Sequence, residues 1–378
     1  MEKQSFVPKL IDLFCGCGGM SLGAARAGFN VVAGIDYDQR ALAAHTLNFP
    51  NAAHLNFDLS STSGADILSA LDLKVGDIDV VAGGPPCQGF SHMGHRDTSD
   101  SRNQLLHDFF RLVSEIKPKA FVFENVPGLL HGHYADWLSD ACFSIEDDYW
   151  INGPQQIAAF QVGAPTLRKR VFVIGIRKAM ISTLPVDLWK ARAKTVTPKV
   201  RHALDGLPLD IESDWKKARG GFRKVQVTRK GHFFRSATGR IPRGVGNREA
   251  IARYRSKREV SSCTGTIHSE DLTERYACLL YGQADSKTKS VRLDPTGYCP
   301  TLRAGTGPDR GSFQAVRPIH YLRPRVITPR EAARLQGFPD WYQFDATKWH
   351  SFRQIGNSVS PLVSEHILAK VRSLLNGL

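Results

Sequence analysis

Two residues with chemically useful side chains follow buried apolar runs in this sequence. The run DIDVVAGG, residues 77–84, predicts a buried strand, and two prolines stiffen its exit just before Cys87. The run AFVF predicts a second such strand, which ends at Glu124. Ligands of open α/β sheets bind beyond the carboxyl ends of strands, so a thiol and a carboxylate there are candidates for nucleophilic and acid–base chemistry. Most lone cysteines, however, are small buried apolar residues, and many isolated glutamates only cap helices.

A glycine-rich turn near the N-terminus predicts a nucleotide-binding unit. LIDLFCGCGGMSLGAARAGF, which begins at Leu10, has the pattern of a strand, a turn and a helix, and the next apolar run ends at Asp36. An acidic residue about 20 positions after the glycines suits the ribose hydroxyls of a nucleotide. The third glycine of the dinucleotide fingerprint is replaced by Ser21. A nucleotide-dependent oxidoreductase is therefore the weaker interpretation.

The positive charge of the chain is concentrated in one segment. The 378 residues carry a net charge of +14, from 50 Lys or Arg and 36 Asp or Glu. Residues 190–325 hold 29 of the basic and 12 of the acidic residues, a net charge of +17, whereas the rest of the chain is at −3. Such asymmetry indicates a polyanionic partner, usually nucleic acid, although a merely solvated basic face gives the same count.

Length and composition narrow the class of protein. The chain is long enough for two domains, or for one large domain with an insertion, and 42% of it is hydrophobic. No apolar run approaches the ~20 residues that span a membrane, and the N-terminus lacks the apolar region of a signal peptide, so we expect a cytoplasmic protein. The seven cysteines have no metal-binding spacing, which predicts free thiols in a reducing compartment and no metal site.

Several short motifs together resemble those of the DNA cytosine-5 methyltransferase family. GGPPCQGFS around Cys87 resembles the family's nucleophile motif, and DLFCGCGGMSLG resembles its S-adenosylmethionine motif. ENVP, which begins at Glu124, resembles the second catalytic motif, and GNSV, which begins at Gly356, resembles the final one. PTLRKR, residues 165–170, matches the family pattern Pro-Gln-x-Arg-x-Arg except that Thr166 replaces the glutamine. The motifs follow the family's order along the chain.

The resemblance implies a set of residues that bind S-adenosylmethionine. In the family, the acidic residue of the first strand lies near the amino acid end of the cofactor, the phenylalanine stacks near its adenine, and the turn glycines admit its methionine. Asp36, where the family usually has glutamate, would hold the ribose, and Asp58 would meet the adenine amino group. The implied cofactor-binding residues are Asp12, Phe14, Gly16, Gly18, Gly19, Asp36, Tyr37, Asp58, Pro85, Asn357 and Val359.

The resemblance also implies a covalent mechanism on cytosine. Carbon 5 of cytosine is a weak nucleophile until a thiolate adds to carbon 6, and Cys87 would supply that thiolate. Glu124 would act as an acid at ring nitrogen 3, while Arg170, supported by Arg168, would reach the carbonyl oxygen. The base must leave the duplex stack for this chemistry, and residues 91–102 are the natural lid. The implied catalytic residues are Cys87, Glu124, Arg168 and Arg170.

The expected fold is α/β, of the S-adenosylmethionine-dependent methyltransferase type: a Rossmann-like, mostly parallel sheet with helices on both faces, plus a smaller, loop-rich basic domain. Residues 1–187 form the catalytic and cofactor-binding domain in this prediction, and residues 188–324 form a target-recognition domain in which basic and aromatic residues are interleaved. Residues 325–378 return to the catalytic domain. In that last segment, Thr328 and Glu331 predict a capping box at a helix start.

The expected activity is transfer of a methyl group from S-adenosylmethionine to a flipped-out cytosine in a specific double-stranded DNA sequence. We expect a monomer that serves a restriction–modification or other DNA-marking system, with any cognate restriction endonuclease acting independently and no membrane involved. Two alternatives remain. An RNA cytosine-5 methyltransferase would use the same residues, whereas a catalytically silent DNA-binding relative would have lost Cys87 or Glu124, and this chain retains both.

Overall fold

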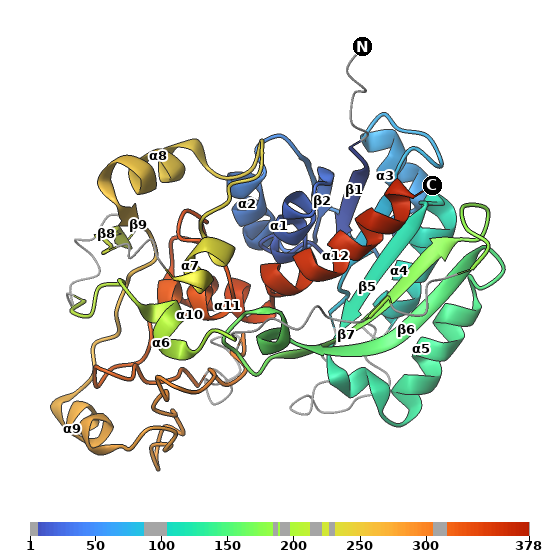
Figure 1. Cartoon of the computed structure of the whole chain (residues 1–378). Coiled ribbons are helices and arrows are strands. Elements are labelled where there is room, and N and C mark those ends of the chain that lie inside the picture. The colour runs from blue at the N-terminus through green and yellow to red at the C-terminus, as the bar shows by residue number, and fades with distance from the viewer. Residues whose placement is uncertain are drawn as a thin grey trace.

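Figure 1 shows the computed structural model of the chain, in which a sheet covered by helices adjoins a second region of short helices and loops. The statements below concern the parts of the chain that the structure describes. These are residues 7–86, 104–183, 188–189, 197–211, 221–226, 231–304 and 316–377.

The seven-stranded sheet has the order β3-β2-β1-β4-β5-β7-β6. All pairs among strands β1 to β5 are parallel, whereas β7 pairs antiparallel with both β5 and β6. The expected mostly parallel α/β sheet is therefore confirmed. The strands are β1 Lys9–Leu13, β2 Asn30–Ile35, β3 Ala53–Leu55, β4 Val80–Gly83, β5 Ala120–Asn125, β6 Tyr149–Ala158 and β7 Lys169–Arg177.

Alternating residues of the central strands bury two separate apolar cores, one on each face of the sheet. Leu10 and Val122 belong to the core beneath α1, α2 and α12, while Ile11 and Phe123 belong to the core beneath α3, α4 and α5. The helices of the first face are α1 Gly19–Arg26, α2 Gln39–Asn48 and α12 Pro361–Asn376. Those of the second face are α3 Gly64–Ala70, α4 Gln104–Ile116 and α5 His133–Phe143.

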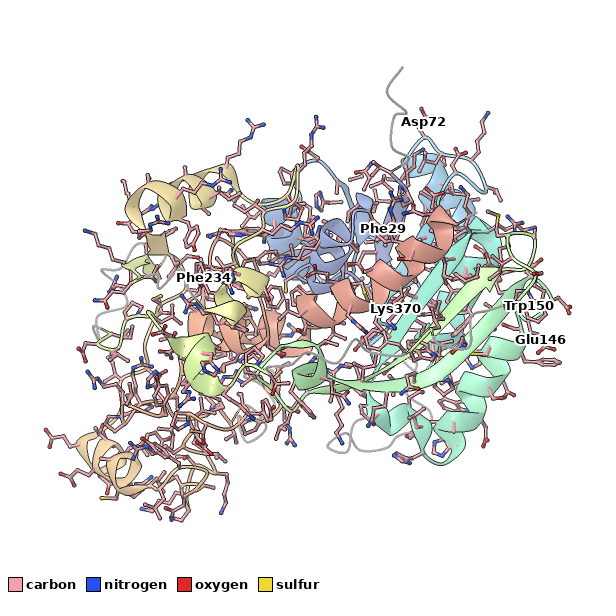
Figure 2. The ribbon with its side chains drawn as sticks, viewed as in Figure 1. Phe29, Asp72, Glu146, Trp150, Phe234 and Lys370 are labelled. Atoms are coloured by element: carbon pink, nitrogen blue, oxygen red, sulfur yellow. The ribbon has the colours of Figure 1, made fainter. Side chains whose placement is uncertain are left out.

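The last helix of the chain packs against the first. A Cβ atom at Gly23 would lie 2.0 Å from Oγ of Ser364, so α1 and α12 touch where only glycine fits. Oγ of Ser364 also donates to the carbonyl of Gly19 at 2.8 Å. Lys370, on α12 in Figure 2, donates from Nζ to the carbonyl of Leu188 at 2.6 Å. The C-terminal helix thus fastens the end of the chain to the first strand–turn–helix unit.

Short helices joined by loops make up the second region, which includes α10 and α11 and so extends beyond the boundary at residue 324 that the sequence predicts (Figure 1). Its helix α10 begins with the predicted capping box: Oγ1 of Thr328 accepts the N–H of Glu331 at 3.2 Å, and Oε2 of Glu331 accepts the N–H of Thr328 at 2.7 Å. The elements are α6 Val200–Leu204, β8 Arg223–Lys224, α7 His232–Ala237, α8 Arg248–Lys257, β9 Glu259–Val260, α9 Glu270–Cys278, α10 Pro329–Leu335 and α11 Lys348–Asn357. Two 3-10 helices, η2 Pro127–Leu130 and η3 Ala159–Val162, belong to the sheet region.

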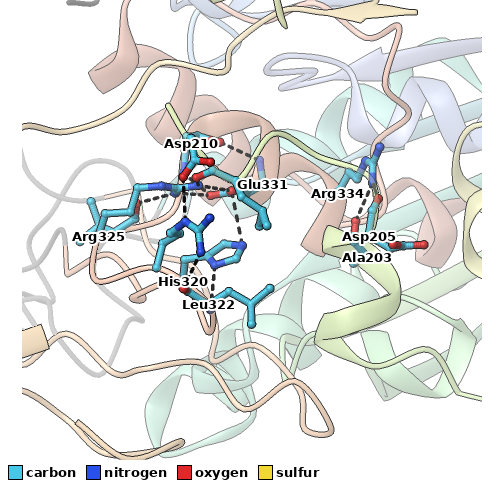
Figure 3. A network of polar contacts seen from close by, with 12 residues as sticks. Ala203, Asp205, Asp210, His320, Leu322, Arg325, Glu331 and Arg334 are labelled. Carbon is cyan, nitrogen blue, oxygen red and sulfur yellow. Dashed lines mark hydrogen bonds and ion pairs between the residues drawn. The ribbon is translucent and has the colours of Figure 1, made fainter. Parts of the chain in front are cut away.

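Buried arginines hold the second region together (Figure 3). Arg334 pairs with both carboxylate oxygens of Asp340, at 2.7 and 2.8 Å, and also donates to two backbone carbonyls at the end of α6. Arg325 pairs in the same bidentate way with Glu331, at 2.9 and 2.8 Å. Arg325 is one of the 29 basic residues of the segment 190–325 and is used inside the fold, so the net charge of +17 overstates what that segment offers to a partner.

Candidate active site

The carboxyl ends of β1 to β5 and the start of β7 meet at one edge of the sheet. Because β7 runs antiparallel to β5, its first residues lie beside the last residues of β5, and Glu124 pairs with Phe172. Leu167, just before β7, donates its N–H to the carbonyl of Cys299 at 2.9 Å, so this edge also borders the second region. The described residues that the sequence assigned to the site lie at these strand ends or in the segments that contact them.

A buried carboxyl group and a guanidinium group meet at this edge. Nε of Arg170 lies 2.7 Å from Oε1 of Glu124, and Glu124 is only 7% exposed. Gly84 makes room for the carboxyl group, since a Cβ atom there would lie 2.4 Å from Oε2 of Glu124. Burial raises the pKa of Glu124, and the charges of Arg170 and Arg168 oppose that rise.

The exit of β4 is fastened to the end of β5 by Asn125. Its Nδ2 donates to the carbonyl of Pro85 at 3.4 Å, and its Oδ1 accepts the N–H of Val126 at 2.8 Å. Asn125 is 3% exposed, so these bonds form in a site from which water is largely excluded. The sequence analysis did not assign Asn125 a role, although it stands within ENVP and its amide can bridge two backbone groups.

The structure describes the residues that lead to Cys87, as far as Pro86. β4 ends at Gly83, as the sequence predicted, and Pro86 is the last described residue of this stretch. Cys87 and the predicted lid, residues 91–102, lie outside the described residues. The chain therefore reaches the residue before the thiol at the same sheet edge that carries Glu124.

Arg168 joins three parts of the site. It is buried, its Nη1 donates to the carbonyl of Leu302 at 3.2 Å, and its Nη2 donates to the carbonyl of Asn357 at 3.3 Å. The start of β7 is thus tied to the second region and to the GNSV motif.

The glycine-rich turn after β1 is open on one side and packed on the other. A Cβ atom at Gly16 would meet nothing within 4 Å, whereas one at Gly19 would lie 2.3 Å from the carbonyl oxygen of Val359. Asp36 closes the turn, because its carboxylate accepts the N–H groups of Gly16 and Asp38, both at 2.8 Å. A carboxylate has about four acceptor positions, so Asp36 retains acceptors for ligand hydroxyls. Burial raises the pKa of Asp36, and the two amide bonds oppose the rise.

The backbone of the turn adopts left-handed conformations, with φ of 58° at Phe14 and 93° at Gly18. Positive φ is uncommon for a residue with a side chain, and such strain concentrates at functional sites. Asp12, at the start of the turn, is 1% exposed, and its Oδ2 accepts a hydrogen bond of 2.5 Å from Oγ of Ser21. The carboxyl group of Asp12 therefore lies beneath the turn rather than in solvent.

The loops after β2 and β3 carry the outer residues of the site. Tyr37 is 75% exposed. Asp58 is exposed, and its Oδ1 accepts the N–H and the hydroxyl of Ser60 at 3.0 and 2.7 Å, which lowers its pKa. Asn56, which the sequence analysis missed, donates from Nδ2 to the carbonyls of Asp36 and Tyr37, both at 2.9 Å. No motif marks Asn56; only its place at the exit of β3 hints at a role.

This arrangement fits S-adenosylmethionine, which presents a ribose diol, an adenine and a cationic sulfur. Asp36 supplies fixed acceptors, Gly16 borders open space, and Tyr37 supplies an exposed aromatic ring. Among the residues that the structure describes, no cluster of three or more His, Cys, Asp or Glu side chains is arranged to hold a metal ion. None of the described helices is both long enough and apolar enough to cross a membrane.

Comparisons with known sequences identify relatives of this chain. A family model described as C-5 cytosine-specific DNA methylase matches residues 8–373. The type II methyltransferase M.XorII of Xanthomonas oryzae is 38% identical over 372 residues, which cover 97% of this chain and 84% of the relative. The type II methyltransferase M.DdeI of Desulfomicrobium norvegicum is 29% identical, over 96% of this chain and 88% of the relative.

Solved structures show the same likeness. An E. coli protein described as a DNA modification methyltransferase encoded within a prophage has a TM-score of 0.88 and 46% identity, over 98% of this chain and 99% of that chain. The Dnmt2 methyltransferase of S. pombe has a TM-score of 0.60 at 17% identity, which shows a shared fold alone.

Proposed function

This chain belongs to the C-5 cytosine-specific DNA methylase family, and we propose that it methylates a flipped-out cytosine within a specific double-stranded DNA sequence through a covalent intermediate on Cys87. The observation that carries the proposal is the buried pair of Glu124 and Arg170, 2.7 Å apart, at the sheet edge where β4 leads to Cys87. A carboxyl group beside a guanidinium group complements the polar edge of cytosine. The carboxyl can bind ring nitrogen 3 and the amino group, and the guanidinium can bind the carbonyl oxygen.

Cys87 is the nucleophile of the proposed reaction. Its thiolate forms a bond to carbon 6 of cytosine, and the electron pair of the 5,6 double bond moves toward carbon 5. Glu124 assists by donating to ring nitrogen 3, which its raised pKa favours, and Arg170 donates to the carbonyl oxygen. S-adenosylmethionine, when bound, supplies a methyl group made electrophilic by a cationic sulfur. Loss of the carbon 5 proton to a base then restores the 5,6 double bond and lets the bond to Cys87 break.

We assign cofactor binding to the ends of β1, β2 and β3. The carboxylate of Asp36 takes the ribose hydroxyls, and its two amide contacts support this role because they fix both of its oxygens. The open side of Gly16 admits the methionine, and Phe14 and Tyr37 lie against the adenine. Asp58 serves the adenine amino group in this proposal. Asp12, Gly18, Gly19, Pro85, Asn357 and Val359 complete the set.

Residues 188–324 read the DNA sequence in this proposal. The net charge of +17 in residues 190–325 supports it, as does their loop-rich architecture. Several arginines of this segment bond to other groups of the fold, but basic side chains also remain exposed. Helix α8, for example, exposes Arg248, Arg255 and Lys257. Exposed charges of this kind are suited to phosphate contacts, which fix the position of a protein on DNA.

The relatives suggest the biological setting. M.XorII and M.DdeI are named type II methyltransferases, and we extend that setting to this chain as the modification enzyme of a restriction–modification system. In this proposal the chain acts as a monomer on DNA in the cytoplasm. A cognate endonuclease acts independently of it.

Bisulfite sequencing of DNA from a host that expresses the chain tests this function. We expect cytosines in one sequence context to be protected, and a host that expresses Cys87→Ser to show none. Methylated cytosines in RNA but not in DNA would replace the proposal with an RNA methyltransferase. A folded wild-type protein that binds DNA and methylates neither would be a catalytically silent relative.

A further inference from the structure

A chain of polar side chains runs beneath the glycine-rich turn. Oγ of Ser21 lies 2.5 Å from Oδ2 of Asp12 and 2.9 Å from Nε2 of His45. Nδ1 of His45 in turn lies 3.0 Å from Nε2 of His54. Asp12, Ser21 and His45 are at most 1% exposed, and His54 is half-buried. The four residues come from β1, α1, α2 and β3, so the tertiary fold brings this row of hydrogen-bonded side chains together.

The ring of His45 occupies a slot that two glycines create. A Cβ atom at Gly34 would lie 2.6 Å from this ring, and one at Gly18 would lie 3.0 Å from it. The ring also stacks on Phe49, with a centroid distance of 4.4 Å. His45 therefore touches the glycine-rich turn directly, and its orientation is fixed by packing as well as by hydrogen bonds.

When Asp12 is ionised, the hydrogen bonds among these four side chains all have the same donor-to-acceptor direction. The single hydroxyl proton of Ser21 points at Asp12, so Oγ of Ser21 must accept from Nε2–H of His45. Burial and the neighbouring His54 lower the pKa of His45 to about 3, so His45 is neutral and its Nδ1 accepts from Nε2–H of His54. Each donor in this network then points toward the carboxylate of Asp12. Aligned hydrogen bonds polarise one another in a buried site, so the two histidines strengthen the final bond.

We propose that Ser21, His45 and His54 are positioning residues that favour the ionised form of Asp12 beneath the glycine-rich turn, and that they thereby favour the cationic S-adenosylmethionine over its product S-adenosylhomocysteine, which lacks the charge on sulfur. This inference rests on the proposed function, because that function supplies the charged cofactor. A nearby positive charge favours the ionised form of a carboxyl group, and a carboxylate favours the binding of a cation in return. Methyl transfer removes the positive charge from sulfur, so the attraction fades once the product has formed.

The electrostatic environment of Asp12 sets its pKa close to neutral pH, so a bound cation can change its protonation. Burial raises its pKa to about 7, while the hydrogen bond from Ser21 opposes the rise and the charges of Asp36 and Glu124 add to it. Among the residues that the structure describes, the remaining titratable groups that interact electrostatically with Asp12 are Cys15 and Cys17 of the turn and Tyr342. Burial raises the pKa of all three, which keeps them neutral near pH 7. Binding of S-adenosylmethionine near pH 7 should therefore expel more of the proton from Asp12 than binding of S-adenosylhomocysteine, which shares the ammonium group of the amino acid end but lacks the charge on sulfur.

Calorimetry on the full chain without DNA tests the proposal with S-adenosylmethionine, S-adenosylhomocysteine and sinefungin, in which an ammonium group replaces the sulfonium. We expect Ser21→Ala and His45→Leu to weaken both cationic ligands by about tenfold, which corresponds to one unit of pKa, and to change the affinity for S-adenosylhomocysteine far less. His45→Gln, which retains a donor toward Ser21, should recover most of the loss. Thr46→Ala is the matched control, since Thr46 lies on the same helix and its hydroxyl donates to the carbonyl of Leu42, at 3.0 Å, outside the polar network.

Proton release gives a second readout. Titrations near pH 7 in two buffers with different ionisation enthalpies should show that the wild type releases more protons with S-adenosylmethionine than with S-adenosylhomocysteine, and that Asp12→Asn abolishes this difference. Parallel weakening of all three ligands in Ser21→Ala and His45→Leu, without loss of selectivity, would overturn the inference. If the folded wild type binds none of the three ligands, the proposed function itself fails.

Discussion

Nε of Arg170 lies 2.7 Å from Oε1 of Glu124 because β7 enters the sheet antiparallel to β5. A parallel strand in that position would begin at the opposite edge and would leave Glu124 buried without this charge. The guanidinium group partly offsets the cost of burying the carboxyl group. Gly84 is the third member of this arrangement, since the other carboxyl oxygen occupies the place of its missing side chain.

Gly84→Ala should lower the catalytic rate while leaving cofactor affinity unchanged. The added Cβ atom would lie 2.4 Å from Oε2 of Glu124, so the carboxyl group must move away from Arg170. A displacement of about 1 Å at a reacting group costs up to about 100-fold in rate. Single-turnover kinetics and calorimetry measure the two effects separately. Gly231→Ala, where a Cβ atom would meet nothing within 4 Å, is the control, and an unchanged rate in Gly84→Ala would remove Glu124 from the mechanism.

Cys87→Ser should abolish methyl transfer while retaining cofactor binding, because an alkoxide is far less available than a thiolate at neutral pH. DNA that carries 5-fluorocytosine should trap the wild type as a stable adduct, since fluorine cannot leave as the carbon 5 proton does. A tritiated-methyl assay and denaturing gels measure the two outcomes. Cys278→Ser, at an exposed cysteine on α9, should behave as the wild type. Turnover at the wild-type rate by Cys87→Ser would exclude Cys87 as the nucleophile.

The strand ends of the site could be predicted from the sequence because they depend on local patterns. The apolar run before Gly83, the run that ends at Glu124, and the capping box of Thr328 and Glu331 all have the predicted structure. Each depends on residues close together in the chain, where periodicity and capping chemistry act directly.

The contacts between strands and the uses of individual charges could not be predicted in this way. The antiparallel direction of β7, the bridge that Asn56 makes to the loop after β2, and the slot that holds His45 depend on residues far apart in the sequence. Net charge also misleads about single residues. Arg292, within the basic segment 190–325, donates to the carbonyls of Ala277, Leu279 and Tyr321, so it stabilises the fold as well as adding to the counted charge.

Asp36→Asn should weaken S-adenosylmethionine binding by about 1–3 kcal/mol, the typical cost of leaving a buried polar group unpaired. Each oxygen of Asp36 accepts one backbone N–H, so an asparagine would set its own NH₂ group against one of those donors. Calorimetry measures the loss. Asp38→Asn is a matched control: it removes the same charge two residues away, and asparagine retains the helix cap that Asp38 forms with Arg40 and Ala41. Equal affinity in the wild type and Asp36→Asn would contradict the ribose assignment.

Asp12→Asn should stabilise the ligand-free protein at pH 8 and not at pH 4. The pKa of Asp12 is raised from 3.8 to about 7, so the folded state holds its proton more tightly than the unfolded state does. Its contribution to stability is therefore complete below pH 4 and is lost as the pH rises through 7. Asparagine does not ionise and avoids that loss, which is at most about 4 kcal/mol for a shift of this size. Denaturant unfolding at both pH values measures the difference, and an equal effect at pH 4 and pH 8 would show that packing rather than charge is responsible.

Binding to DNA should depend steeply on salt if the basic segment supplies the affinity. Neutralisation of phosphates releases counterions, so the logarithm of the affinity should fall linearly with the logarithm of the salt concentration, by about 0.9 for each phosphate contact. Replacement of Arg248, Arg255 and Lys257 on α8 by glutamine should make this slope less negative for specific and unrelated DNA alike. Fluorescence anisotropy across a salt series measures the slope. An unchanged slope would place the phosphate contacts on other residues of the segment.

Replacement of residues 188–324 by the matching segment of a relative that methylates another site should transfer that relative's specificity. The structure favours a folded chimera, because Arg334 and Arg330 of the retained α10 hold the segment largely through backbone carbonyls, which survive a change of side chains. Thermal unfolding should first show that the chimera folds cooperatively, and calorimetry should show that it binds S-adenosylmethionine as the wild type does. Bisulfite sequencing then identifies the methylated sites. An active chimera that still methylates the original sequence would show that recognition resides outside residues 188–324, whereas methylation of the donor's sequence would assign the reading of DNA to this segment.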